Sequence, residues 1–422
     1  MSDTLPPLRG NATVQSDTVA ATMRGKWRIL FILAIAELLV MSVWFSASAV
    51  LEPLTAEWNL GNAGRAWLTM SVQIGFVVGA FGSAVLTLAD RFPAVGFMGL
   101  TSLAAAATTA LIPLVADGLI VALVLRFLTG IFLAGVYPVG MKIVATWTQA
   151  DRGLGIGILV GALAVGSGSP HLINAFGGMG VWEPVLYTSA GLAALGGVLA
   201  LVFCSEGPYR SKPVPFKWAD IGNVLRDREV MLANGGYLGH MWELYAMWAW
   251  FPIFAAGSFE MSGVDTRWAS VLAFGVIGAG GVGSLLAGQL ADRFGRTTVT
   301  IGSMGISGGC ALVAGAFFGA SPWIIIILGL VWGFAIVADS AQFSAAVSEL
   351  AEPRLMGTAL TLQTSMGFLL TLLSIRLLPV IQEWIGWSGA FAFLALGPIA
   401  GVWAMWVLRQ SDVAVRLAGG RR

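Results

Sequence analysis

Charged residues are scarce in this chain. Lysine, arginine, aspartate and glutamate make up 11% of its 422 residues, whereas 57% are hydrophobic. Soluble globular domains carry about 25% charged residues. So few charges cannot cover a water-facing surface of this size, which excludes an ordinary soluble domain and predicts a protein whose solvent is the lipid bilayer. The formal net charge of +1 shows no basic or acidic excess, so we expect no nucleic-acid partner.

Cysteine and histidine are rare as well, with two of each. Cys204 and Cys310 stand singly in apolar segments and predict neither a disulfide framework nor a metal site. The sequence has no phosphate-binding Gly-x4-Gly-Lys and no His-Glu-x-x-His. A glycine pattern of the dinucleotide-binding type at 278–283 lies inside an apolar span without a preceding strand, and it predicts close helix packing instead. We therefore expect no enzyme, no cofactor and no metal.

Long apolar stretches fill the rest of the chain. A transmembrane helix needs about 20 predominantly apolar residues, and twelve stretches meet this length. We predict an all-α membrane protein with twelve transmembrane helices in two pseudo-symmetric six-helix bundles. The predicted spans are Trp27–Leu51, Ala66–Ala89, Ala94–Ala116, Gly118–Thr146, Leu154–Ala175, Pro184–Cys204, Val230–Ala255, Trp268–Ala291, Thr297–Gly319, Pro322–Val347, Gly357–Ile381 and Gly386–Leu408.

Polar stretches divide these spans into parts. Residues 1–26 are predicted to be a cytoplasmic tail, 27–204 the first bundle, 205–229 a cytoplasmic linker, 230–408 the second bundle and 409–422 a cytoplasmic tail. With a cytoplasmic N-terminus, eighteen arginines and lysines fall on the inside and only Arg65 and Arg267 on the outside. This positive-inside bias predicts a multi-pass protein of the inner cell membrane, with both termini cytoplasmic.

The two halves of the chain repeat each other. The first span contains Glu37-Leu38-x-x-Met41-x-x-Trp44-Phe45, and the seventh contains Glu243-Leu244-x-x-Met247-x-x-Trp250-Phe251. Further matches keep their order and nearly constant spacing, which indicates two duplicated bundles in parallel orientation. Transporters of this kind place the solute site at the interface of the repeats, near the bilayer midplane.

A loop motif follows the second and the eighth spans. The second copy is the fuller one, Gly288-Gln-Leu-Ala-Asp292-Arg293-Phe-Gly295-Arg296; the first keeps only Asp90 and Arg91, with Pro93-Ala94 in place of Gly-Arg. This motif and the six-plus-six layout resemble the major facilitator superfamily. Arg126-x-x-x-Gly130 resembles a second motif of that family, whose arginine is implicated in coupling. Ser169-Pro170 departs from the Gly-Pro motif of its antiporters, which leaves antiport undecided.

The resemblance implies that spans 1, 4, 7 and 10 line a central cavity and that the loop motif gates its cytoplasmic side. Ionisable groups inside a membrane usually face a cavity or each other. Six of the seven such residues fall on these four spans: Glu37, Arg126, Lys142, His240, Glu243 and Asp339. The seventh, Arg376, is expected to snorkel outward. Trp44, Trp250 and Trp332 are the candidates for the cavity wall.

Several roles remain open for these groups. Glu37 and Glu243 are repeat-related, and either is a candidate to carry a coupling proton; the alternative is a permanently paired acid bound to Arg126 or Lys142. Arg126 is expected to hold an anionic part of the solute or to pair with a glutamate. Lys142 and Asp339 are candidates for an ion pair between the bundles. His240 is either a proton relay or a structural histidine.

These features predict a secondary transporter that moves a small polar or organic solute by alternating access, with anionic solutes among the candidates, and that is coupled to protons. The alternatives are a drug or metabolite efflux antiporter, an uncoupled facilitator of the same fold and, more remotely, a non-transporting receptor. The expected partners are the solute, protons and the lipid bilayer, and the protein is expected to be a monomer.

Overall fold

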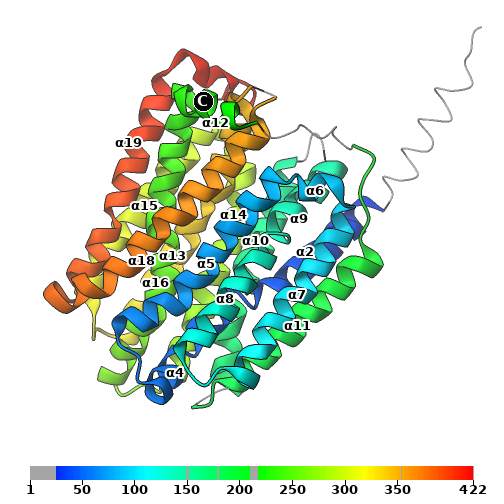
Figure 1. Ribbon diagram of the computed structural model, residues 1–422. Helices are drawn as coiled ribbons and strands as arrows, with labels where there is room; N and C mark the ends of the chain where they lie inside the picture. The colour runs from blue at the N-terminus through cyan, green and yellow to red at the C-terminus, as the bar shows by residue number, and fades with distance from the viewer. Residues whose placement is uncertain (1–24, 149–151, 178–179, 210–216, 353, 422) are drawn as a thin grey trace, which may run out of the picture.

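The computed structural model describes residues 25–148, 152–177, 180–209, 217–352 and 354–421; the side chains of Asp90 and Arg152 lie outside the described part. Within these residues all regular elements are helices, as the sequence predicts. Figure 1 shows them as two bundles that stand side by side. We call the end of the bundles with Lys26 and Gln410 the terminal face, and the end with Asn59 and Glu383 the distal face.

The N bundle contains the first half of the chain. Its helices are α2 (Lys26–Met41), α3 (Ser46–Ala49), α4 (Leu51–Trp58), α5 (Asn62–Val85), α6 (Leu88–Arg91), α7 (Ala94–Val115), α8 (Leu119–Leu133), α9 (Tyr137–Trp147), α10 (Arg152–Gly177) and α11 (Glu183–Phe203).

The C bundle contains the second half, preceded by the linker helix α12 (Trp218–Arg226). Its elements are α13 (Arg228–Met261), α14 (Arg267–Phe294), α15 (Arg296–Ala314), η1 (Gly315–Phe317), α16 (Pro322–Ala338), α17 (Ser340–Leu350), α18 (Met356–Leu394), α19 (Leu396–Gln410) and η2 (Asp412–Gly419).

Nine segments of the described chain are long and apolar enough to cross a membrane. The last of them, Met356–Gln410, includes two crossings because α18 turns back at Ile385 and Gly386, where Gly386 takes a φ of +69° that favours glycine. Two more crossings fall outside the nine: α2 is only 16 residues long, and α13 carries charges along its 34 residues. With these the helices follow the order of the twelve predicted spans.

The first predicted span is not one continuous helix. The sequence predicts a helix over Trp27–Leu51, but α2 ends at Met41 and the chain passes through a turn at Ser42–Phe45 before α3 begins. The prediction of one helix over Trp27–Leu51 is therefore wrong, and Glu37 and Trp44 lie on opposite sides of the turn. Span 4 is interrupted too, between α8 and α9, next to Pro138.

Glycines let helices approach closely inside each bundle. A Cβ atom on Gly130 of α8 would clash with the Val72 carbonyl oxygen of α5. The same contact recurs in the C bundle, where a Cβ on Gly333 of α16 would clash with the Val276 oxygen of α14. Small residues of this kind are what membrane helices use to pack without a hydrophobic driving force. The matching contacts agree with the repeat in the sequence.

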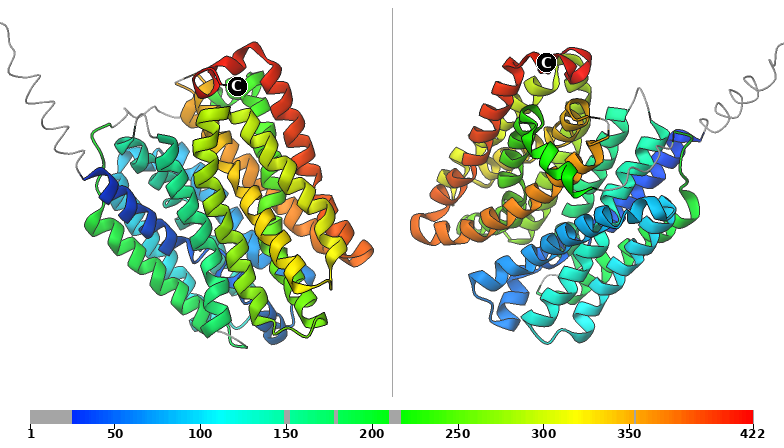
Figure 2. Two further views of the ribbon diagram at one scale, coloured as in Figure 1. Left: turned by 180° about the vertical axis from the view of Figure 1, so that it is seen from behind. Right: turned by 45° about the horizontal axis from the view of Figure 1, so that its top comes forward.

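The bundles meet along two seams, which we name by their helices. One seam is α10 against α14, visible at the centre of the left view of Figure 2, where Gly161 faces Gly281. The other is α5 against α18, where Thr371 Oγ1 donates a 2.6 Å hydrogen bond to Gln73 Oε1. Near the distal face, Asn62 of α5 also donates to Glu383 of α18. Both seams are therefore contacts between different bundles.

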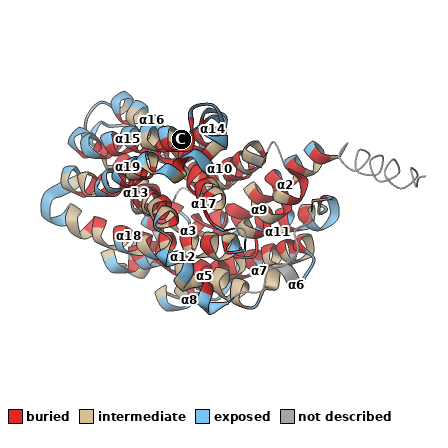
Figure 3. Cartoon of the chain, turned by 90° about the horizontal axis from the view of Figure 1, so that it is seen from above, coloured by how far each residue is buried: buried red, intermediate tan, exposed pale blue. Residues whose placement is uncertain are grey.

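The linker and the C-terminal tail contain structure that the sequence analysis did not predict. In the linker, the Trp218 ring of α12 lies 5.8 Å from the Phe81 ring of α5. The tail forms η2, which buries Ala414 and Leu417 and packs against α17. Around the outside of the bundles large apolar side chains are exposed, Trp384 for 80% of its surface and Trp323 for 72%; Figure 3 shows the contrast with the buried interior. An apolar perimeter of this kind suits lipid.

Candidate functional site

Arg126 stabilises the turn that interrupts the first span. Its side chain on α8 is completely buried. Nη1 donates a 2.7 Å hydrogen bond to the Val43 carbonyl oxygen, Nη2 donates to the Trp44 oxygen, and Nε donates at 3.4 Å to the Leu68 oxygen. A helix end inside a membrane leaves carbonyl groups that must find donors within the protein. The guanidinium supplies those donors, so the predicted pairing of Arg126 with a glutamate is wrong.

Lys142 lies on α9 toward the terminal face. Its Nζ donates a 2.5 Å hydrogen bond to the Ala89 carbonyl oxygen of α6. This bond ties α9 to the connection between α5 and α7. The predicted ion pair with Asp339 is therefore wrong, because Asp339 contacts a different residue.

Asp339 instead pairs with His240 inside the C bundle. His240 Nδ1 lies 2.8 Å from Asp339 Oδ1, and the side chains of both residues are 1% exposed. Asp339 occupies the interruption between α16 and α17, and His240 lies in the middle of α13. The second ring nitrogen of His240, Nε2, has no hydrogen-bond partner among the described residues. The pair connects the interruption in span 10 to the continuous helix of span 7.

Glu243 lies one turn beyond His240 and accepts two hydrogen bonds. Trp332 Nε1 of α16 donates to Glu243 Oε1 at 2.7 Å, and Ser307 Oγ of α15 donates to Oε2 at 2.9 Å. Both donors are neutral. Trp332 was expected in the cavity wall, and its bond to Glu243 explains why a tryptophan is useful there. Ser307 was missed because a serine in an apolar span carries no signal in the sequence.

Glu37, the repeat counterpart of Glu243, has no such partners. Its carboxylate is completely buried between α2, α9 and α10, and neither oxygen has a hydrogen-bond partner within the described part of the chain. Gly140 of α9 leaves room for it, since a Cβ there would lie 3.1 Å from Glu37 Oε2. The Tyr137 hydroxyl lies within range of an electrostatic interaction with the carboxylate.

Aromatic side chains from both bundles meet around Trp44. The ring of Trp44 lies 5.1 Å from that of Phe76 on α5, 5.9 Å from Tyr245 on α13 and 5.5 Å from Phe368 on α18. We call these four residues the Trp44 cluster. All four are at most 5% exposed, and Trp44 Nε1 has no hydrogen-bond partner among the described residues. Of the four, only Trp44 was predicted from the sequence to line the interior.

Trp250, the repeat counterpart of Trp44, has a different environment. It lies within the continuous helix α13, and its Nε1 donates a 3.1 Å hydrogen bond to the Ile375 carbonyl oxygen of α18. This contact anchors two helices of the same bundle to each other. The structure thus places Trp44 between the bundles and Trp250 within one of them.

Three tyrosines connect the two bundles near these groups. Tyr137 of the N bundle lies within electrostatic range of Tyr237 and Tyr245 of the C bundle. The Tyr237 ring also lies 6.1 Å from the His240 ring. Tyr237 is therefore a polar group beside His240, and Tyr137 one in the surroundings of Glu37. The tyrosines could not be picked out from the sequence, because one hydroxyl on an aromatic span residue does not stand out.

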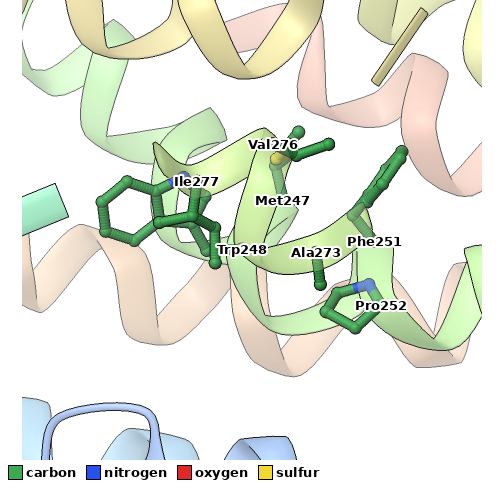
Figure 4. Close-up of a pocket in the computed structure, with 7 residues that line it drawn as sticks. All are labelled: Met247, Trp248, Phe251, Pro252, Ala273, Val276 and Ile277. Carbon is green, nitrogen blue, oxygen red and sulfur yellow. The ribbon is translucent and has the colours of Figure 1, made fainter. Parts of the chain in front are cut away.

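The interior around these groups is closed. Glu37, Glu243 and Asp339 are each at most 1% exposed. A narrow hollow between α13 and α14, lined by apolar side chains including Trp248, Phe251 and Ile277, has no room for a water molecule (Figure 4). The central cavity implied by the family resemblance is thus not open around the buried acids.

The second loop motif forms a charged network on the terminal face. Arg296 donates to both oxygens of Glu349, with a shortest distance of 2.6 Å, and lies 3.6 Å from Asp292. Glu349 also accepts from the Ala418 backbone N–H of η2 at 3.0 Å. Gly288 stands on α14 one turn before Asp292, and Gly295 takes a φ of +95° at the turn into α15.

Asp292 reaches the neighbouring bundle. A Cβ atom on Gly153, at the start of α10, would lie 3.2 Å from Asp292 Oδ2. A carboxylate beside a helix N-terminus is stabilised by the helix dipole. Arg293 lies instead with its guanidinium 5.3 Å from the Phe294 ring.

The first copy of the motif differs from the second in its described residues. Arg91 is exposed, Ala94 stands where the second copy has Arg296, and the Asp90 side chain lies outside the described residues. The backbone N–H of Ala94 donates instead to Glu206 Oε1 at 2.8 Å.

Comparison with known proteins assigns the fold. The sequence profile of the Major Facilitator Superfamily matches residues 33–374. A crystal structure of a point mutant of the nucleoside transporter NupG superposes with a TM-score of 0.68 at 14% identity, over 90% of this chain and 99% of that one. A bacterial homolog of the human lysosomal transporter Spinster, inward-facing and unoccupied, gives 0.64 at 15% identity, over 91% and 95%. None of the curated proteins compared with the chain matches it.

Proposed function

The chain belongs to the Major Facilitator Superfamily and is a multi-pass membrane transporter, and from this premise we propose that it moves a small organic solute by alternating access, coupled to protons through Glu37. In this mechanism the two bundles rock about a site near the midplane, opening along the seams α10–α14 and α5–α18 in turn. The Trp44 cluster, built from both bundles, has to separate in such a movement.

The observation that carries the proposal is the isolation of the Glu37 carboxylate. An ionised carboxylate in a low-dielectric interior is costly unless it is paired or hydrogen-bonded, and Glu37 has neither kind of partner among the described residues. Tyr137 is the titratable group beside it on α9, while Lys142 on the same helix bonds to Ala89. Uptake of a proton removes the charge, and access to water restores it. Glu37 therefore has the properties of a proton carrier.

Glu243 is the weaker candidate for the same role. The hydrogen bonds from Trp332 and Ser307 satisfy both of its oxygens in the closed interior. Hydrogen bonds to the charged form favour that form, so Glu243 has less reason to change its protonation state when the bundles move.

Solute-linked proton movement tests the proposal. Purified protein is placed in liposomes that enclose a pH-sensitive dye, and a panel of cationic, anionic and neutral organic solutes is added outside. We expect at least one solute to change the internal pH with wild-type protein, the change to vanish in Glu37→Gln, and the change to persist in the matched control Glu243→Gln. Equal proton movement in wild type and Glu37→Gln contradicts the role of Glu37.

The same measurement separates the alternatives. An uncoupled facilitator moves solute without proton movement in any variant, and an efflux antiporter moves protons in the direction opposite to the solute. A non-transporting receptor binds solute without moving it. A non-transporting receptor would not explain why both bundles have buried acids.

A further inference from the structure

The membrane interior of this protein has three basic residues, and the structure positions each of them away from the buried acids. Arg126 donates to backbone carbonyl oxygens, and Lys142 donates to the Ala89 oxygen. Arg376 of α18 is half-buried. It lies seven residues beyond Leu369, about two helical turns, so both residues are on the same side of the helix. Leu369 is 52% exposed, so this side faces the outside of the bundle. None of the three bonds to Glu37, Glu243 or Asp339 in the described structure.

None of these arginine and lysine side chains therefore neutralises a buried acid in the described structure. Glu243 accepts from neutral donors, Asp339 pairs with a histidine, and Glu37 has no hydrogen-bond partner in the described part. An anionic solute that reaches these acids finds Arg126 and Lys142 already bonded to backbone carbonyl oxygens. A cation meets a carboxylate that lacks a partner. The sequence kept anionic solutes among the candidates because basic residues lie within the spans. The contacts of Arg126 and Lys142 in the structure argue against an anionic solute.

The Trp44 cluster offers the second half of a site. Its four aromatic rings come from both bundles, and Trp44 Nε1 is buried without a partner among the described residues. Aromatic faces attract organic cations and bury their apolar groups. Trp44 lies seven residues beyond Glu37 in the sequence, in the turn that follows the end of α2 at Met41. Tyr137 lies within electrostatic range of both Glu37 and Tyr245 of the cluster.

We propose that the solute is an organic cation with an apolar or aromatic body, whose charged group pairs with Glu37 while its body packs against the Trp44 cluster. This inference rests on the proposed function of Glu37 as the proton carrier. Since one carboxylate serves both the proton and the cation, the two compete, and transport takes the form of exchange: the solute leaves the site when Glu37 takes up a proton.

Two ions of the same shape and opposite charge provide the test. Equilibrium binding of tetraphenylphosphonium and tetraphenylborate to the purified protein in detergent is measured, with binding to protein-free micelles subtracted. We expect the phosphonium ion to bind and the borate ion not to bind above the micelle background. Lowering the pH should weaken phosphonium binding, because protons compete for Glu37.

Substitutions locate the site. Glu37→Gln should weaken phosphonium binding by about tenfold or more and remove its pH dependence, whereas Glu37→Asp, which keeps the charge, should retain both. Trp44→Ala should weaken binding but leave the pH dependence in place. Glu243→Gln is the matched control, which should bind like wild type. Gel filtration of each variant confirms that it is folded.

Several outcomes overturn the inference: equal or tighter binding of the borate ion, no phosphonium binding, or phosphonium binding that Glu37→Gln leaves unchanged. These outcomes are distinct from failure of the proposed function. If the liposome assay shows Glu37-dependent proton movement with an anionic or neutral solute, the proton carrier stands and only the cation is wrong. If Glu37→Gln leaves proton movement intact, the carrier role fails, whichever ion binds.

Discussion

Spans 1 and 7 carry the same five residues at the same spacing, yet the two segments fold differently. In the N bundle the helix ends at Met41, the chain turns through Trp44, and Glu37 is buried without a partner among the described residues. In the C bundle α13 continues through Trp250 for 34 residues, and Glu243 accepts two hydrogen bonds. The shared motif cannot be the cause of this difference. Neighbouring helices supply it.

Arg126 is the neighbour that matters most in the N bundle. In the repeat, the glycine contact of Gly130 corresponds to that of Gly333, which places Gly329 of α16 at the position of Arg126. At this position the C bundle therefore has no guanidinium that could donate hydrogen bonds to the carbonyl groups of an interrupted helix. It has Trp332 instead, which donates to Glu243. In the N bundle, span 1 is interrupted and its acid, Glu37, has no hydrogen-bond partner among the described residues. In the C bundle, span 7 is continuous and its acid, Glu243, accepts two hydrogen bonds.

The largest effect is expected from Arg126→Met. The carbonyl groups of Val43, Trp44 and Leu68 lose their donor, and each unsatisfied buried group costs about 1–3 kcal/mol. We expect a large fall in folded yield and in the melting temperature of the protein in detergent. Arg376→Met, which removes a half-buried arginine from the outer flank of α18, is the control and should change the melting temperature little. A normal melting temperature for Arg126→Met contradicts the role of Arg126 at the turn.

Next in size is the contrast between Glu243→Met and Glu37→Met. The first substitution leaves Trp332 Nε1 and Ser307 Oγ without their acceptor and should cost about 1–3 kcal/mol of stability. The second removes an acid that has no partner to lose, so it should leave the melting temperature unchanged or raise it. Thermal unfolding of both variants beside wild type is the measurement. Equal destabilisation by the two substitutions would contradict the conclusion that Glu243 is held by hydrogen bonds and Glu37 is not.

Arg296→Ala should have a smaller effect, since it makes the C bundle resemble the N bundle, where the corresponding residue is Ala94. The bidentate contact with Glu349 is partly exposed, so we expect a loss of about 1–2 kcal/mol, and faster proteolysis of the tail after Gln410. Arg91→Ala, at the exposed arginine of the first motif, is the control and should have little effect. If both substitutions act alike, the network around Glu349 contributes nothing special.

The smallest effect is expected from Ser42→Ala. Ser42 Oγ lies 2.7 Å from the Leu39 carbonyl oxygen of α2 and 3.0 Å from the Ser189 carbonyl oxygen of α11, and its single hydrogen is donated to one of the two. Its repeat counterpart is Trp248, which has no hydroxyl. Loss of the Ser42 hydrogen bond should cost about 0.5–1.5 kcal/mol, well below the effect of Arg126→Met in the same unfolding assay. A cost as large as that of Arg126→Met would mean that the turn depends on its own local sequence.

The fold was largely predictable, and the pairings were not. Apolar length, charge bias and the repeat predicted an all-helical membrane protein of this superfamily because a membrane permits few other ways to satisfy the backbone. The predicted ion pair of Lys142 with Asp339 was wrong, and so was the alternative in which Arg126 pairs with a glutamate. The structure gives these residues carbonyl oxygens and a histidine as partners, which leave no pattern along the chain.

By itself the sequence determined the class of the protein, the order and orientation of its repeats, and which ionisable residues lie within the spans, because hydropathy and residue spacing are properties of single segments. Only the tertiary structure decided that one copy of the shared motif turns while the other remains helical, and that Glu37 is without a partner while Glu243 is hydrogen-bonded. These outcomes depend on side chains such as Arg126, Trp332 and Ser307. They belong to other helices, far away in the sequence, so no local sequence pattern reveals their contacts.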